Sequence, residues 1–217
     1  MITTPELINA LAANAAPVRR LRPPLARAAL WLLIAAMVLI LLAIGQGVRP
    51  DLAERLRQPA FGIGLGASLL TGILAAVGSF LISLPDRSRF WALLPVPALV
   101  VWLSAIGYGC VINWVGLAPN GIALGEVARC FATLLLTSVP LSLAILVMLR
   151  HAALLRPSAV ALSGSLAVAA ITATALSLFH NLDATIMILI WNLGVAALIV
   201  GLAGMFGRRM FLSVAPR

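Results

Sequence analysis

The sequence predicts an all-α integral membrane protein, a six-transmembrane-helix bundle with a short cytoplasmic N-terminal helix. Of its 217 residues, 63% are hydrophobic and only 10% are charged, too few to cover the surface of a water-soluble domain of this size. Six apolar runs of about 20 residues, long enough for a hydrocarbon core of about 30 Å, are separated by short polar links. The runs lie at 28–44, 60–83, 91–111, 127–149, 158–179 and 185–206.

Residues 1–27 form the only long polar segment and are predicted to be a cytoplasmic arm. Thr3 or Thr4 can cap a helix whose first residue is Pro5, and Glu6 falls in the first turn, where an acidic side chain is favourable. We therefore expect a short helix that ends near Ala15–Pro17.

One side of this short helix is apolar. Leu7, Ile8 and Leu11 have the spacing of a single helical stripe. Four arginines follow before and at the start of the first apolar run, and we expect them to lie against anionic headgroups. They are Arg19, Arg20, Arg22 and Arg27.

The arginines between the apolar runs set the orientation. Eleven of the 15 fall in the N-terminal arm, the second and fourth links and the C-terminal tail, against four on the other side. The positive-inside rule then places both termini in the cytoplasm, around a transmembrane domain at 28–207 and a tail at 208–217. Because the arginines fill short links, they predict membrane orientation and no direct contact with nucleic acid. The exclusive use of Arg over Lys indicates a GC-rich, bacterial source and hence the inner membrane.

The first outer link has the sequence RPDLAERLRQP and is predicted to form a short amphipathic helix on the outer surface. Asp51 and Arg55 have the i,i+4 spacing of a helical ion pair. This link is also the exception to the arginine distribution, because it holds three arginines on the outer side.

Small residues in the second run predict close helix packing. Gly62/Gly66 and Ser68/Gly72 both have the small-xxx-small spacing that lets helices approach in lipid. The GIGLG string that begins at Gly62 is not a phosphate-binding loop, because it lies inside a hydrophobic run with no preceding strand.

Prolines predict weak points in two of the helices. Pro95 and Pro97 in the third run and Pro140 in the fourth remove backbone donors, and they are expected to kink or loosen these helices. Such kinks serve either a moving element or static packing.

The outer ends of the spans hold the candidate signal-sensing residues Cys110, Cys130, His180 and Asp183. Their spacing matches no specific metal signature, so no metal site and no cofactor are predicted. No arrangement of a nucleophile with a base, and no pair of acids, indicates catalysis, so the chain is not expected to be an enzyme.

The chain resembles the negative-regulator-of-sigma-F (NrsF) family of bacterial membrane anti-sigma factors, in order and along nearly its whole length. The matching segments are ELINALAANAAPVRRLRPP, RPDLAERLRQPAF, LPDRSRFWALLPVPALVVWLSAIGYGC, MLRHAALLRP and FHNLDATIMILIWN. The resemblance implies six transmembrane helices and a partner, an extracytoplasmic-function sigma factor, that is held at the membrane until envelope, oxidative or metal stress releases it. The arm is the cytoplasmic element with an apolar stripe to offer, so Leu7, Ile8 and Leu11 are expected to bind the sigma factor.

The resemblance also implies cysteine-based sensing near the outer face, and there the chain departs from the family's pattern. Cys130 matches one of the cysteine positions, but Asn181 stands where the second is expected, after His180. In the sixth run Trp191-Asn192 replaces a Trp-His pair. Cys110 can substitute as the partner of Cys130 in a disulfide, or both cysteines can be small packing residues.

A small transporter or channel-like protein is the alternative function. Six spans and kinked helices fit it, but no ionisable residue lies in the middle of any predicted span, whereas transporters and proton relays usually carry one.

Overall fold

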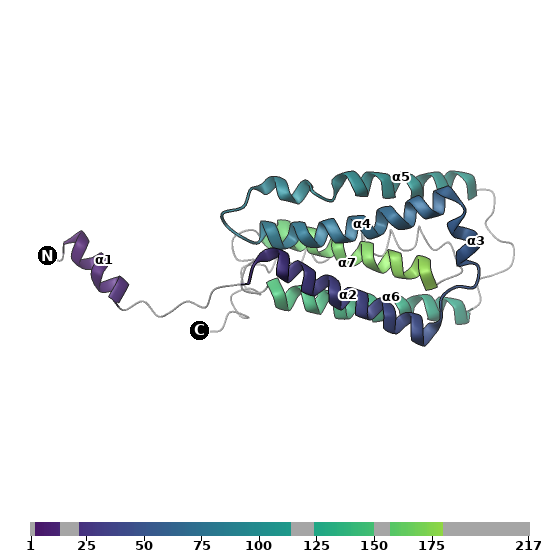
Figure 1. Cartoon of the computed structure of the whole chain (residues 1–217), viewed down its shortest axis with the longest axis horizontal. Coiled ribbons are helices and arrows are strands. Elements are labelled where there is room, and N and C mark those ends of the chain that lie inside the picture. Colours follow the sequence, from purple (N-terminus) through teal and green to yellow (C-terminus); the bar gives the residue numbers. More distant parts are fainter. Residues whose placement is uncertain (1–2, 14–21, 114–123, 150–156, 180–217) are drawn as a thin grey trace.

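The computed structural model describes residues 3–13, 22–113, 124–149 and 157–179, and within these ranges every regular element is a helix (Figure 1). Five of the helical segments are long and apolar enough to cross a membrane, and they coincide with the first five predicted spans. The sixth predicted span, 185–206, lies outside the described residues. The helices are α1 (Thr4–Ala13), α2 (Pro24–Gln46), α3 (Leu52–Leu56), α4 (Pro59–Ile82), the 3₁₀ helix η1 (Arg89–Leu93), α5 (Val96–Asn113), α6 (Leu124–Leu149) and α7 (Pro157–Phe179).

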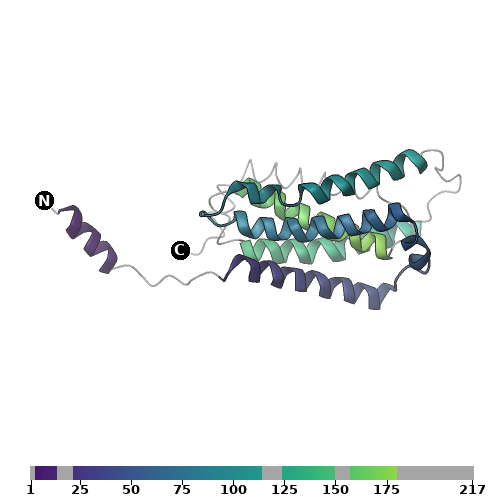
Figure 2. The same ribbon diagram turned by 45° about the horizontal axis from the view of Figure 1, so that its top comes forward.

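Helix α1 has a reciprocal cap at its N-terminus. The Thr3 carbonyl accepts the Leu7 amide at 3.0 Å, and the Glu6 carboxylate accepts the Thr3 amide at 2.8 Å. The cap is therefore Thr3, and the helix begins at Thr4 rather than at Pro5. In both views α1 lies apart from the other helices (Figures 1 and 2).

Proline begins three of the long helices, where a missing amide costs nothing because the first helical N–H groups have no partner in any case. The residues are Pro24 in α2, Pro59 in α4 and Pro157 in α7. The first long helix thus begins at Pro24, four residues before the apolar run that starts at Ala28. The helix ends at Gln46. The next residue, Gly47, caps it with a φ of 75°, a value that residues with a side chain rarely adopt.

The third predicted span is divided. Residues Arg89–Leu93 form η1, a turn follows at Leu94 and Pro95, and α5 begins at Val96. The loosening expected at Pro95 and Pro97 is therefore a complete break near the start of the span. By contrast, α6 continues as α-helix through Pro140.

Consecutive long helices run antiparallel, and α4 and α7 lie between α5 on one side and α2 and α6 on the other (Figures 1 and 2). We call the end where α2 begins the arm end and the opposite end the far end. The antiparallel course places the end of α4, the end of α6 and the start of α7 at the arm end.

Close packing of α4 against α7 forms the centre of the bundle. A Cβ on Gly72 would lie 2.8 Å from Cδ1 of Ile171, and the Ser68 and Thr174 hydroxyls are 2.9 Å apart. The packing expected of Ser68/Gly72 is therefore confirmed. A Cβ on Gly66 would meet nothing within 4 Å among the described residues, so the packing expected of Gly62/Gly66 stays a prediction.

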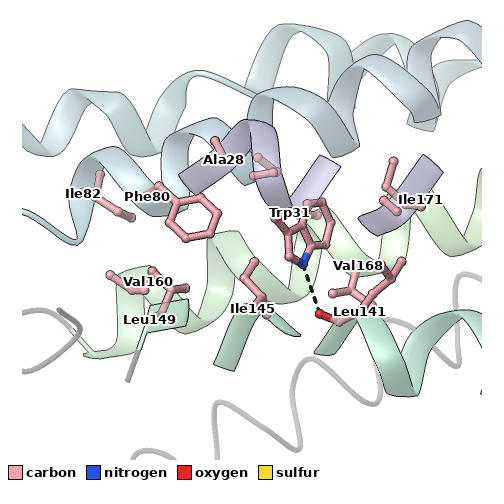
Figure 3. Close-up of a cluster of buried hydrophobic side chains, with 14 residues drawn as sticks. Ala28, Trp31, Phe80, Ile82, Leu141, Ile145, Leu149, Val160, Val168 and Ile171 are labelled. Carbon is pink, nitrogen blue, oxygen red and sulfur yellow. Dashed lines mark hydrogen bonds between the residues drawn. The ribbon is translucent and has the colours of Figure 1, made fainter. Parts of the chain in front are cut away.

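The largest buried apolar cluster lies between α2, α4, α6 and α7, towards the arm end (Figure 3). Trp31 and Phe80 are its fully buried aromatic residues. The Trp31 indole N–H donates to the Leu141 carbonyl at 3.1 Å, so the ring's polar atom is satisfied inside the apolar cluster. The cluster therefore fixes how these four helices pack together at the arm end.

Candidate functional site

The predicted sigma-factor-binding residues lie on α1. The side chains of Leu7 and Ile8 are 49% and 59% exposed, and Leu11 lies one turn further along the same helix. The backbone and side-chain hydrogen bonds from Thr3 hold the pKa of the Glu6 carboxyl below its usual range, so Glu6 stays charged in the first turn, where the helix dipole favours an anion. The result is a short, capped helix on which Leu7 and Ile8 of the apolar stripe are exposed.

Of the four predicted sensing residues, Cys130 is the one whose side chain the structure describes. It is a free thiol, 2% exposed, packed with Trp102, Leu134 and Leu176 near the start of α6. Cys110 belongs to α5, near the end of that helix, but the structure does not describe its side chain. His180 and Asp183 also lie outside the described residues, directly after the end of α7.

An ionic cluster occupies the far end of the bundle. The Arg49 side chain, 2% exposed, donates to both oxygens of Asp51 at 2.7 and 2.8 Å and lies over the Phe61 ring at 5.7 Å. Arg55, one helical turn after Asp51, lies 3.5 Å from the same carboxylate, so the predicted i,i+4 pair is confirmed. The Arg49 hydrogen bonds lower the pKa of Asp51 to about 2, and the carboxylate is charged at any physiological pH.

This cluster also attaches the first link to α7. The Arg49 amide donates to the Leu178 carbonyl at 3.1 Å, two residues before His180. Arg49 thus contacts α7 through its backbone and α4 through Phe61, and its side chain is buried between them. Sequence reasoning paired Asp51 with Arg55 and overlooked Arg49, although a turn at Pro50 returns the chain so that the two side chains meet.

At the arm end, Arg27 is buried instead of lying at the surface. Its guanidinium donates to the Met148 carbonyl near the end of α6 and lies over the Phe80 ring, 5.1 Å from its centre. A cation at a helix C-terminus is favoured by the helix dipole. Arg27 therefore belongs to the bundle, and the expectation that it joins the arm's arginines at the headgroups is wrong. The sequence did offer one sign that Arg27 belongs to the bundle: it follows Pro24, a residue that suits the start of a helix, by less than one turn.

Within the described spans, the buried hydroxyl groups mostly bond to backbone carbonyls of their own helices. Thr71 donates to Ala67 at 2.7 Å, Thr137 to Thr133 at 2.8 Å and Ser79 to Ala76 at 2.8 Å. These hydroxyls are thereby satisfied inside the apolar bundle by their own helices. Among the described residues no group of three metal-ligating side chains comes together.

The comparisons with known proteins identify one family. No curated protein and no solved structure matches the chain. The family model described as negative regulator of sigma F (NrsF) matches residues 11–212, nearly the whole chain. The matched range includes the end of α1 and all five of the described spans. The chain belongs to the NrsF family, the negative regulators of sigma F.

Proposed function

We propose that this chain is a membrane anti-sigma factor that sequesters an extracytoplasmic-function sigma factor at the inner face of the bacterial inner membrane. The family match over residues 11–212 carries the proposal, because a negative regulator of a sigma factor requires a sigma factor as its partner. Envelope, oxidative or metal stress releases that partner, and no catalytic step is involved.

The arm supports this proposal physically. An amphipathic helix that leaves its apolar stripe exposed is suited to bind in a groove of a soluble partner. Leu7 and Ile8 are exposed on such a helix, and Leu11 has the matching position. Both termini face the cytoplasm in this proposal, where the sigma factor is found.

A small transporter remains the alternative, and the spans count against it. The middle of each predicted span lacks an ionisable residue, and several of the described buried hydroxyls, such as those of Thr71 and Thr137, donate to backbone carbonyls of their own helices.

The decisive experiment changes Leu7 and Leu11 together to Asp. Two charges on the apolar stripe should abolish docking, so the sigma factor no longer copurifies from detergent extracts and its regulon is switched on. The amount of protein in the membrane should stay the same, because the arm packs against no other helix in the views of Figures 1 and 2.

Asn9→Asp with Ala13→Asp is the matched control, since it places two charges on the opposite, also exposed, face of α1. We expect this control to retain the sigma factor. Full retention by the Leu7/Leu11 variant would exclude the arm as the binding element, and absence of any sigma factor from the unsubstituted protein would contradict the function itself.

A further inference from the structure

Side-chain hydrogen bonds between helices divide the described bundle into two pairs. In the first pair, α4 and α7, the Ser68 and Thr174 hydroxyls lie 2.9 Å apart and the Ser163 hydroxyl donates to the Ala75 carbonyl at 3.0 Å. Because lipid tails satisfy an apolar helix face as well as another helix does, such bonds and close packing decide which helices stay together in a membrane.

The second pair is α2 and α6, which are joined by three hydrogen bonds along their length. Together we call these bonds the α2–α6 seam. They run from the Thr133 hydroxyl to the Gln46 side-chain oxygen at 2.8 Å, from the Trp31 indole to the Leu141 carbonyl at 3.1 Å, and from the Arg27 guanidinium to the Met148 carbonyl.

The seam bridges the weak point of α6. Pro140 has no amide to donate to the carbonyl four residues earlier, so the helix has lost a bond at its middle. One bond of the seam, at Thr133, lies before Pro140, and the other two, at Leu141 and Met148, lie after it. Helix α2 is therefore tied to both halves of α6.

The two ends of the seam meet different parts of the protein. Arg27 is the last residue of the segment predicted as the arm, and the Gln46–Thr133 bond lies one turn from Cys130 on α6. Contacts from this pair to α4 and α7 are mainly apolar, as where Ile145 of α6 meets Gly164 of α7. Two helices in apolar contact can slide along each other, whereas a hydrogen bond between them inside a bilayer keeps them in register.

We propose that α2 and α6 move as one unit, and that the seam transmits a displacement at the far end of α6 to the base of the arm. This inference rests on the proposed function for its consequence, the release of the sigma factor. The coupling itself is a structural property that can be measured without the sigma factor.

A bulky side chain at Cys130 supplies a displacement without knowledge of the natural signal. Cys130 is 2% exposed and packs against Trp102, Leu134 and Leu176, so Cys130→Phe overfills the site and forces α6 to shift. Cys130→Met is a milder version, for use if the Phe variant fails to accumulate.

The displacement is read as a distance between spin labels at Leu25 and Leu162, both exposed and both near the arm end. The labels are attached at Leu25→Cys and Leu162→Cys in chains that all carry Cys110→Ala, and the reference chain also carries Cys130→Ala so that no other free thiol remains. We expect Cys130→Phe to change this distance by about 2 Å, the size of helix shifts that operate switches.

Breaking the seam with Arg27→Met, Trp31→Phe and Gln46→Met should abolish that change. Trp31→Phe alone, which removes the bond beside Pro140, should reduce it. The matched control is Ser163→Ala with Thr174→Val, which removes the bonds of the α4–α7 pair and should leave the change intact.

Copurification of the sigma factor gives the functional readout on the same chains. Cys130→Phe should lower the retained sigma factor several-fold, and the seam-broken version should retain it as the unsubstituted chain does. A label distance that Cys130→Phe leaves unchanged, or changes equally with and without the seam, overturns the inference. If no sigma factor copurifies even with the unsubstituted chain, the proposed function fails while the distance result still decides on the seam.

Discussion

Two arginines, at opposite ends of the bundle, are buried in the structure. Arg49 is paired with a carboxylate, whereas Arg27 donates through one nitrogen to a helix-end carbonyl and lies over an aromatic ring, and its other terminal nitrogen has no hydrogen-bond partner among the described residues. From the sequence, both were ordinary link arginines, counted for orientation. Their burial depends on where α6 and α7 end in space, and periodicity along α2 contains no information on that.

The Arg49–Asp51 pair gives a prediction about stability. Asp51→Asn leaves the Arg49 guanidinium, 2% exposed, without its counter-charge, and an unpaired buried charge is strongly destabilising. We expect a clearly lower Tm of the detergent-solubilised protein. Asp86→Asn is the control: Asp86 and Arg87 form an exposed pair 4.0 Å apart, and such pairs contribute little. Equal effects of the two substitutions would show that the far-end cluster does not hold the bundle together.

The pH dependence of this pair follows from the pKa of Asp51. Because the folded protein lowers that pKa to about 2, the pair's contribution is complete above the unfolded value of about 4 and is lost as the pH falls towards 2. Thermal unfolding between pH 5 and 8 should therefore show no dependence due to Asp51. Below pH 4, the difference in Tm between the unsubstituted protein and Asp51→Asn should shrink.

At the scale of elements, the contact between α4 and α7 depends on a missing side chain. A Cβ at Gly72 would lie 2.8 and 2.9 Å from two carbons of Ile171, a β-branched and stiff residue. We expect Gly72→Ala to lower the free energy of unfolding by about 1–3 kcal/mol through overpacking, measured by denaturant titration in detergent.

Gly66→Ala is the matched substitution on the same helix. A Cβ there meets nothing within 4 Å in the part of the chain that the structure describes, so the change is expected to be neutral, or slightly stabilising because alanine favours helix more than glycine does. Loss of stability at both positions would mean that the effect comes from the backbone of α4 and not from its contact with α7.

Helix existence was predictable, whereas helix ends were less so. Five apolar runs predicted five described spans, because length and hydropathy alone decide whether a helix can cross a bilayer. Pro24 begins α2 four residues before its apolar run, since proline suits the first helical position, whereas α4 matches its predicted run to within one residue at each end. Pro95 divided the third span, where only a kink was expected.

At the scale of the whole molecule, residue size indicates which helices lie at the centre of the bundle better than hydrophobicity does. Helix α7 is the most enclosed of the described spans, and its sequence PSAVALSGSLAVAAITATALSLF is rich in Ala, Ser, Gly and Thr. Helix α2, rich in Leu and Ile, is largely exposed to the surrounding medium. Small residues mark helix interfaces in lipid, and that signal was used for α4 alone.

The span count and orientation are open to a direct test at the level of the whole chain. Eleven arginines against four predict that both termini lie inside, and this orientation would require an even number of spans and hence a sixth after α7. Alkaline phosphatase, active only in the periplasm, should be active when fused after Asp183 and silent when fused after Arg217. A fusion after Arg87, in the second link, is the silent control, and one after Gln58 is the active control. Activity after both Asp183 and Arg217 would show that the chain crosses the membrane five times. It would then place the C-terminus outside while leaving the arm, and the sigma factor proposed to bind it, on the cytoplasmic side.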